Sequence, residues 1–563
     1  PNAHDRQAEL RLDQADGPEG AHRELYGSQA IKPGSLEDSE LWRRITSDDD
    51  DVMPPPDSAK KPLSDDEKSN IKRWIEDGAK YTAFWSFTPP QRPPLPEVQH
   101  QQWNQQPIDR LVLRRLEAEG MTPKPMADRR TLIRRLSLDL TGLPPTRPEI
   151  RRFLDDTSYD PFVKDQRAGD LYAEPTRDQL VASGFNRLHL IIDRGTALPE
   201  ESYTRNVVDR VTAVGTAFMG MTVQCAVCHD HKYDPITAKD FYQLFAFFNN
   251  LDAPPETGGR QGTDFERGLQ PPYIRLSTET QEARLALFDR QIGERTAQVK
   301  QIEEETGKAT EDEQKQELAA KLKEAKAALE QARKEKQKYD ATIPVAMVMK
   351  EKADIRPAHI LIRGQYDKPG DRVERDTPAF LHPMKETDKP RTRMDLAEWF
   401  VSPEHPLTAR VAVNRFWQQL FGVGLVKTSE DFGAQGEWPS HPELLDYLAV
   451  SFRETGWDVK ALIKQIVLTE TYKQASAASP KEFEADPENR LLSRGPRFRL
   501  DSEVIRDQIL ATSGLLNKQM FGKSVKPPQP SGLWESVSMP SSYPRIYEAD
   551  TGDKIYRRSL YTF

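Results

Sequence analysis

The sequence predicts a mainly α-helical protein of several domains, and three observations support this prediction. A chain of 563 residues is longer than a single hydrophobic core usually serves. Apolar residues recur at helical spacing along most of the chain, while strand-like alternation is limited to residues 343–349 and 359–363. The 44 prolines gather between the apolar stretches, which is typical of loops that join compact modules.

Composition and charge argue against two classes of protein, nucleic-acid-binding proteins and membrane-spanning proteins. The chain has 80 basic and 89 acidic residues, well mixed, for a net charge of -9. No region has the basic excess of a nucleic-acid-binding domain, and no apolar stretch approaches the roughly 18 residues of a membrane span. We therefore expect neither a nucleic-acid partner nor a transmembrane segment. Residues 1–5 lack the apolar core of a signal peptide, but residue 1 is not Met, so the chain can start at a processing site.

Residues 1–85 are predicted to form a first, small helical module. Its second helix is expected to begin after Ser64, with Glu67 in the capping-box position, and Gly78 is a typical helix stop. Proline-rich residues 86–104 then predict an extended linker.

Residues 105–279 are predicted to form a second helical module. An apolar stripe from Val207 to Phe218 leads directly into Cys225-Ala226-Val227-Cys228-His229, and another stripe from Phe241 to Phe248 follows. The motif at 225–229 is therefore expected at a helix end, between two helices rich in apolar side chains.

Residues 280–340 differ sharply from their neighbours, because Glu, Lys, Gln and Ala dominate and Pro is absent. Apolar residues recur at heptad-like spacing on both sides of Gly307, which predicts an antiparallel helical hairpin, a short coiled coil. Helices of this composition are usually solvated spacers, and we expect no chemistry there. Residues 341–389 are predicted to be a connecting segment with short strands, and residues 390–563 a C-terminal, mostly helical module.

The two cysteines, Cys225 and Cys228, are the only ones in the chain, so they cannot join distant loops as a disulfide framework. Their spacing, followed at once by His229, is that of heme c attachment. Two thiols at this spacing meet the two vinyl groups of a heme, and the next residue supplies the proximal iron ligand. We therefore predict that Cys225, Cys228 and His229 hold a heme c, with His229 on the iron.

Two other interpretations of the motif remain open. A zinc site would need His229 and His231 to join the two cysteines in a cramped knuckle. A redox-active cysteine pair normally follows a strand in a βαβ pattern, which the sequence does not show here. His231 lies too close to His229 to reach the other face of the same heme. With its polar neighbours it predicts either a lid over the heme propionates or an ordinary polar turn.

The distal iron ligand is left open by the sequence. An open position would permit chemistry at the iron, while a sixth ligand favours electron transfer. The candidate ligands are Met219, Met221, His189, His405 and His441. Met53 is a separate candidate: a Met in a proline-rich loop before a terminal amphipathic helix is the usual position of the axial sulfur in small c-type cytochromes, although such a Met can also serve loop packing.

The sequence resembles a planctomycete-type family in which a cytochrome c-like domain precedes two domains of unknown function. The matching segments of the first domain are residues 11–13, 33–34, 43–45 and 52–56; those of the second are 107–109, 134–144 and 225–235; those of the third are 414–417, 431–433, 440–442 and 532–535. The resemblance implies that residues 1–85 are a cytochrome c-like domain and that a second heme, bound upstream of Pro1, takes Met53 as axial ligand.

The sequence departs from the family pattern in three places. Family members have a CxxCH just before the segment that matches Pro1, a helical block is expected near residues 156–159, and the third domain normally continues past Phe563. The sequence is therefore interpreted as an incomplete part of a longer protein.

These observations predict an extracytoplasmic multiheme cytochrome, because heme c is attached outside the cytoplasm. The expected role is electron transfer with a redox protein or another heme, and the family's association with polysaccharide breakdown suggests coupling to carbohydrate oxidation. One alternative is a heme-dependent oxidoreductase, peroxidase-like or polysaccharide-cleaving, with an open distal site. Another is a cell-surface structural protein, a homo-oligomer or surface assembly, in which heme stiffens the fold. No catalytic residues are predicted.

Overall fold

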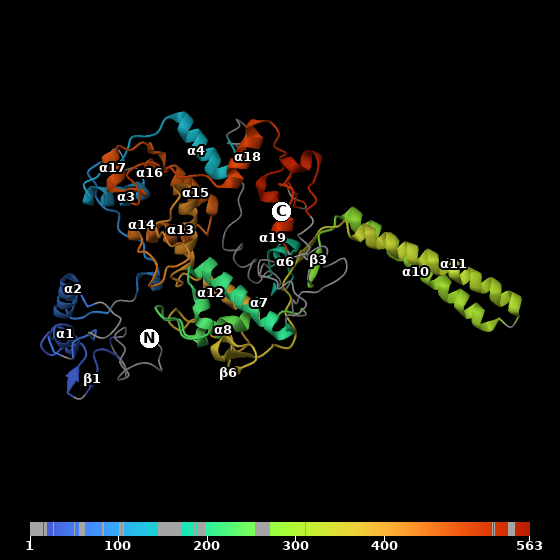
Figure 1. Cartoon of the computed structure of the whole chain (residues 1–563), viewed down its shortest axis with the longest axis horizontal. Coiled ribbons are helices and arrows are strands. Elements are labelled where there is room, and N and C mark those ends of the chain that lie inside the picture. Colours follow the sequence, from blue (N-terminus) through green and yellow to red (C-terminus); the bar gives the residue numbers. More distant parts are fainter. Residues whose placement is uncertain are drawn as a thin grey trace.

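The computed structural model is a mainly helical chain with a compact body, a small N-terminal part and a long projecting arm (Figure 1). The structure describes residues 15, 20–25, 27–49, 51–55, 62–81, 84–100, 103, 106–144, 171–172, 174–183, 187, 198–253, 271–309, 311–520, 522, 524–538 and 547–562. The predicted fold class, mainly α and multi-domain, is confirmed. None of the helices in these ranges is both long and apolar enough to span a membrane.

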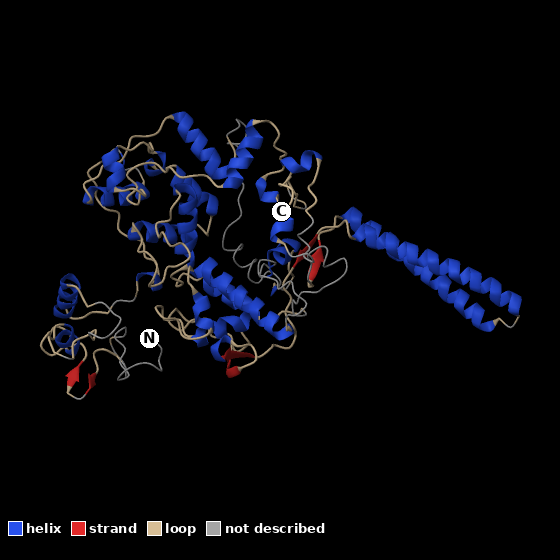
Figure 2. Cartoon of the chain, in the orientation of Figure 1, coloured by secondary structure: helices blue, strands red, loops and turns tan. Residues whose placement is uncertain are grey.

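Strands are short and few in the described ranges (Figure 2). They form three two-stranded antiparallel sheets: β1 (Glu24–Leu25) with β2 (Ser28–Gln29), β3 (Tyr273–Arg275) with β4 (Val345–Met347), and β5 (Ala358–Leu361) with β6 (Pro369–Val373). β4 and β5 lie in the two segments that the sequence predicted as strands.

The N-terminal part contains α1 (Glu40–Ile45) and α2 (Asp65–Glu76) around a small core of its own. The predicted capping box is confirmed, because the Ser64 hydroxyl accepts from the Glu67 amide and the Glu67 carboxylate accepts from the Ser64 amide. Gly78 follows the helix with φ +95, a left-handed conformation that favours glycine.

The compact body is built from helices that precede the arm in the sequence and helices that follow it. Its helices are α3 (Pro107–Ala118), α4 (Arg129–Thr141), α6 (Arg177–Ser183), α7 (Pro199–Val214), α8 (Ala238–Phe248), α12 (Arg393–Phe400), α13 (Thr408–Phe421), α14 (Pro442–Glu454), α15 (Val459–Val467), α16 (Glu470–Lys473), α17 (Pro480–Ala485), α18 (Ser502–Thr512) and α19 (Leu533–Val537). Short turns of other helix types are η3 (Trp85–Phe87), η8 (Gly215–Met219), η9 (Val223–Val227), η10 (Ile362–Gly364), η12 (Gly552–Tyr556) and η13 (Ser559–Tyr561).

One continuous hydrophobic core runs through this body, from Ile108 of α3 to Leu492 near the end of the chain. The second and third predicted modules therefore share a core, although their sequences are separated by the arm. A buried carboxylate ties them together: Asp109 of α3 accepts from the amides of Glu470 and Thr471 and from the Thr471 hydroxyl at 2.7–3.1 Å. These bonds cap the short helix α16, and a buried carboxylate needs such donors.

The projecting arm consists of α10 (Glu279–Lys308) and α11 (Asp312–Asp340), which run side by side away from the body (Figure 1). Val299, Ala325 and Leu329 form its own small apolar cluster. The helices separate after Lys308, one residue beyond the expected break at Gly307. At the root of the arm, Arg275 and Val345 are paired across β3 and β4.

Because the two ends of the arm meet in one antiparallel sheet, its removal should leave the body intact. Replacement of residues 280–340 by a short Gly/Ser turn is expected to leave the thermal unfolding midpoint of the body unchanged within a few degrees. The measurement is calorimetry of the two chains. A large drop in the midpoint, or loss of the soluble folded chain, would show that the arm belongs to the core.

Candidate heme-attachment site

The chain enters the motif through a tight reversal at the end of α7. Gly215 begins the π-helical turn η8, and a Cβ there would lie 2.6 Å from a methyl group of Val223. Gly220 ends the turn with φ +58, and a Cβ there would lie 2.8 Å from the ring of Phe432. Glycine at these two positions lets the chain fold back closely against the end of α7.

The following turn, η9, directs the two cysteines outward. Val223 and Ala226 are fully buried, while Gln224, Cys225 and Cys228 are exposed. Both thiols are free. Burial of the small apolar residues between them anchors the turn, so the two sulfur atoms lie at the surface, open to a large ligand.

His229 is exposed beside the cysteines, and its ring is oriented by the backbone. Its Nδ1 lies 2.7 Å from the carbonyl oxygen of Asp230. A carbonyl oxygen only accepts, so Nδ1 carries the proton and Nε2 keeps a free lone pair in the neutral ring. This is the arrangement in which a histidine that ligates a metal is normally held.

The sulfur of Cys228 rests against a loop from the segment between β5 and β6. Gly364 has φ +70, and a Cβ there would come within 3.0 Å of Cys228 Sγ and 2.9 Å of a Val227 methyl group. The buried Tyr242 of α8 donates its hydroxyl proton to the Val227 carbonyl oxygen at 2.8 Å. Burial raises the pKa of this phenol, so Tyr242 remains a donor at neutral pH.

A surface hollow of about 720 Å³ adjoins the motif through Gln224, Val227 and Gly364. Val208 adds an apolar wall, and the charged lining is mixed: Arg205 and Lys368 are basic, and Glu201, Asp209 and Asp367 are acidic. Arg205 is paired with Glu201 at 2.5 Å, so the apolar wall and the position beside the motif are what suit the hollow to a ligand held there.

His231 does not lie with the cysteines. Its side chain is only 5% exposed, and its Nδ1 accepts from the amide of Asp234 at 2.9 Å. Its Nε2 lies 3.3 Å from the hydroxyl of Thr222. His231 therefore stabilises the loop through hydrogen bonds to Asp234 and Thr222. A zinc knuckle would instead need its ring beside the two exposed thiols. Across the described ranges, no three His, Cys, Asp or Glu side chains gather as a metal site.

Asp234 ties the motif to the C-terminal region, which the sequence had not indicated. Its carboxylate accepts from the amide of Ala434 at 2.7 Å, and a Cβ on Gly433 would lie 2.4 Å from that carboxylate. Burial raises the pKa of Asp234. Asp234, one of the polar neighbours of His231, is therefore bonded to the C-terminal region.

Three family models match the chain in sequence order. Residues 1–57 match Planctomycete cytochrome C, residues 107–159 and 150–253 match a protein of unknown function (DUF1549), and residues 392–563 match a protein of unknown function (DUF1553). The chain belongs to the planctomycete-type cytochrome family. No curated protein and no solved structure matches it.

In this planctomycete-type chain the candidate distal ligands are buried away from the exposed motif. Met219 and Met221 are 0% exposed within the core, and His405 and His441 are 1% and 3% exposed. His189 lies outside the described residues. All four described candidates are thus buried, whereas His229 is exposed.

Met53 lies in the N-terminal part, within the span of the cytochrome model. Its side chain is 40% exposed, and its amide donates to the carbonyl oxygen of Arg44 at 3.0 Å. It belongs to the part that has its own small core, not to the body that holds the cysteines. This placement suits a ligand for a different heme.

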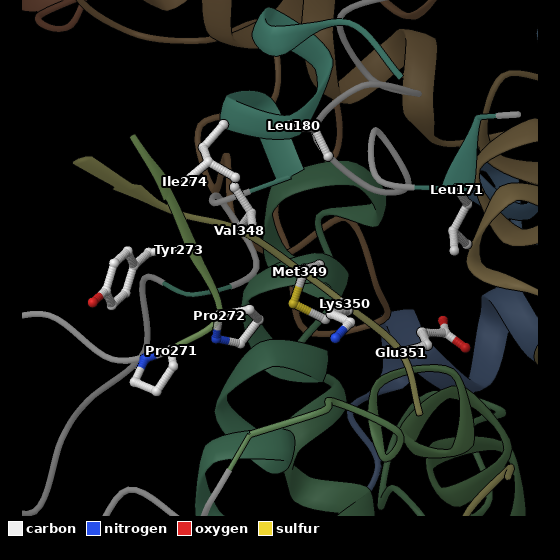
Figure 3. Close-up of a pocket in the computed structure, with 10 residues that line it drawn as sticks. All are labelled: Leu171, Leu180, Pro271, Pro272, Tyr273, Ile274, Val348, Met349, Lys350 and Glu351. Carbon is white, nitrogen blue, oxygen red and sulfur yellow. The ribbon is translucent and has the colours of Figure 1, made fainter. Parts of the chain in front are cut away.

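Two further features of this planctomycete-type chain were not predicted. His382 stacks on Trp399, with ring centroids 5.0 Å apart, and His405 meets that indole edge-on at 4.4 Å. Burial lowers the pKa of both histidines, so both are neutral at pH 7. A second hollow, of about 710 Å³, is lined mainly by apolar side chains around β3 and β4 (Figure 3).

Gly364 offers a test of the packing around Cys228. Gly364→Ala is expected to lower the free energy of unfolding by about 1–3 kcal/mol more than Gly456→Ala, because only the first methyl group meets the thiol and Val227. Gly456 is the matched control: it has φ +74 and open space around it, so both variants share the left-handed strain. Urea unfolding measures the difference. Equal losses would mean that the loop does not pack on Cys228.

Proposed function

We propose that this member of the planctomycete-type family carries a heme c at Cys225, Cys228 and His229 and acts in electron transfer outside the cytoplasm. The observation that carries the proposal is the orientation of His229, whose Nδ1 donates to the Asp230 carbonyl oxygen and leaves Nε2 free beside two exposed thiols. The match of residues 1–57 to Planctomycete cytochrome C supports the class of protein.

Different residues would hold different parts of the proposed heme. The thiols of Cys225 and Cys228 would each add across a vinyl group, which forms two thioether bonds with no leaving group. His229 Nε2 would ligate the iron, and Lys368, which lines the adjoining hollow, would offer a cation to a propionate. A bound heme would supply one-electron transfer. Because the ligation of heme c takes place where thiols meet the extracytoplasmic machinery, the proposed location follows from the proposed cofactor.

A second heme is part of the proposal. Met53 lies in the part that matches the cytochrome model, and its exposed sulfur is available to an iron. The proposed partner is another heme or a redox protein. Coupling to carbohydrate oxidation rests on the family resemblance alone, and so does a structural role at the cell surface.

A heme enzyme with an open iron position is the second candidate. The observation that favours it is that Met219, Met221, His405 and His441 are buried, whereas His229 is exposed. A spectrum of the oxidised and reduced protein separates the two functions. A six-coordinate low-spin iron at this heme supports electron transfer, and a high-spin iron that binds small ligands supports catalysis.

Heme attachment is tested directly by mass spectrometry. In protein made together with the ligation machinery, a denatured peptide over residues 221–232 is expected to carry one heme that acid acetone does not extract. The double variant Cys225→Ser, Cys228→Ser should carry none, while Gln224→Ser, an exposed change in the same turn, should carry heme as the parent does. A native peptide with two free thiols and one zinc would overturn the proposal.

The ligand role of Met53 has its own signature. Thioether ligation raises the potential of an iron centre and gives a weak absorption near the red end of the spectrum. Met53→Ala in the complete protein is expected to remove that band and leave the covalent heme in place. Met126→Ala serves as control, because Met126 is an exposed methionine of the body. An unchanged band in Met53→Ala would place the sulfur ligand elsewhere.

A further inference from the structure

We propose that a hollow in the C-terminal region binds a small organic oxyanion, meaning a carboxylate, sulfate or phosphate carried on a flat or apolar body. The hollow measures about 520 Å³ and lies between the end of α13, the short helix α17 and the loop after Asn489. The side chains that give it chemical character are Lys427, Phe483, Glu488, Arg494, Arg497 and Phe498. The inference does not depend on the heme proposal.

Arg494 is the central observation. It is only 6% exposed, and its Nη2 donates to the carbonyl oxygens of Asp486 at 2.6 Å and Pro487 at 3.1 Å. Its Nη1 is buried and has no hydrogen-bond partner within the described residues. Among those same residues, no carboxylate lies within ion-pair distance of this guanidinium. A buried charge is costly, and an oxyanion in the hollow that Arg494 lines would offset that cost.

The backbone around Arg494 is held in place before any ligand arrives. The Asn489 side chain donates to the Arg494 carbonyl oxygen at 2.8 Å and accepts from its amide at 3.3 Å. The amide of the next residue, Gly495, donates to the carbonyl oxygen of Ala475 at 2.9 Å. A Cβ on Gly495 would lie only 2.2 Å from the Gln474 carbonyl oxygen, so glycine is needed at this position. A guanidinium fixed in this way loses little entropy on binding, which favours affinity.

The charge of the lining also favours an anion. Lys427, Arg494 and Arg497 face a single carboxylate, that of Glu488, which is already paired with Lys427 at 2.9 Å. The side chains that line the hollow therefore carry an excess of positive charge. Arg497 is exposed, so its guanidinium can approach a bound ligand from the solvent side. Arginine suits planar or tetrahedral oxyanions, because its donors lie in a fixed fork.

The walls indicate that the oxyanion has an apolar or flat body. Phe483 is 57% exposed and Phe498 is 43% exposed, so part of each ring is open to a ligand, although the Arg494 guanidinium lies over the Phe483 ring at 5.7 Å. Phe498 is held flat against Gly422, where a Cβ would lie 2.6 Å from its ring. Exposed rings beside a cationic group are typical of a binding surface rather than of a packed core.

Calorimetric titration of the complete chain tests the proposal with three probes. Phenyl sulfate is expected to bind more tightly than inorganic sulfate, and phenol is expected not to bind. Arg494→Met should weaken phenyl sulfate binding by about tenfold or more, and Arg497→Gln by about threefold, because each removes a charged donor. Arg499→Gln is the matched control, since Arg499 is exposed, lies two residues away and does not line the hollow. Its affinity should be unchanged.

Three outcomes would overturn the proposal. The first is that neither phenyl sulfate nor inorganic sulfate binds the parent chain. The second is that Arg497→Gln and Arg499→Gln weaken phenyl sulfate binding equally, and the third is that a folded Arg494→Met chain binds phenyl sulfate with full affinity. Circular dichroism shows whether Arg494→Met folds, since Arg494 also holds the loop at Asp486. Where it does not fold, the comparison of Arg497→Gln with Arg499→Gln decides.

Discussion

A single loop of the C-terminal region, residues 432–434, forms hydrogen bonds to the chain on both sides of the CxxCH motif. On one side, the Phe432 amide donates to the Gly220 carbonyl oxygen at 2.7 Å, and its ring fills the space left by the missing side chain of Gly220. On the other side, the Ala434 amide donates to the Asp234 carboxylate. Because both ends of the loop that bears the cysteines are fixed, the two thiols and His229 can lie exposed without becoming disordered. The geometry of the motif is therefore a joint property of two sequence regions about 200 residues apart.

Local features of this fold were predictable from the sequence, because their partners lie within one or two helical turns. The Ser64–Glu67 capping box is such a case. The alternation of residues also predicted the strands β4 and β5, but not that β4 pairs with β3 across the arm. The contacts that assemble the body were not predictable, since Asp109 meets Thr471 across 362 positions and no periodic pattern encodes such a pair. For the same reason the sequence showed two modules where the structure has one core.

The candidate site shows the same division. The spacing of Cys225, Cys228 and His229 fits the chemistry of a porphyrin with two vinyl groups, so the hypothesis of heme attachment needed no structure. The inward turn of His231 depends on Asp234 and Thr222, and only the folded loop shows it. Arg494 is a stronger example. A sequence shows an arginine among several, and only the coordinates show that one of its donors is buried and unused.

The exposure of the motif also has a consequence for the proposed heme. Exposed thiols and an exposed imidazole by themselves cost little free energy, because all three groups are solvated. A porphyrin attached there would present a large apolar surface, and the hollow beside Val227 can cover only part of it. Apolar surface left in water favours association with another apolar surface. The proposed redox partner, or the heme proposed for the N-terminal part, would supply that surface, and close contact between the two is also what electron transfer requires. The exposure of the motif would thus favour both attachment of the proposed heme and its contact with a redox partner.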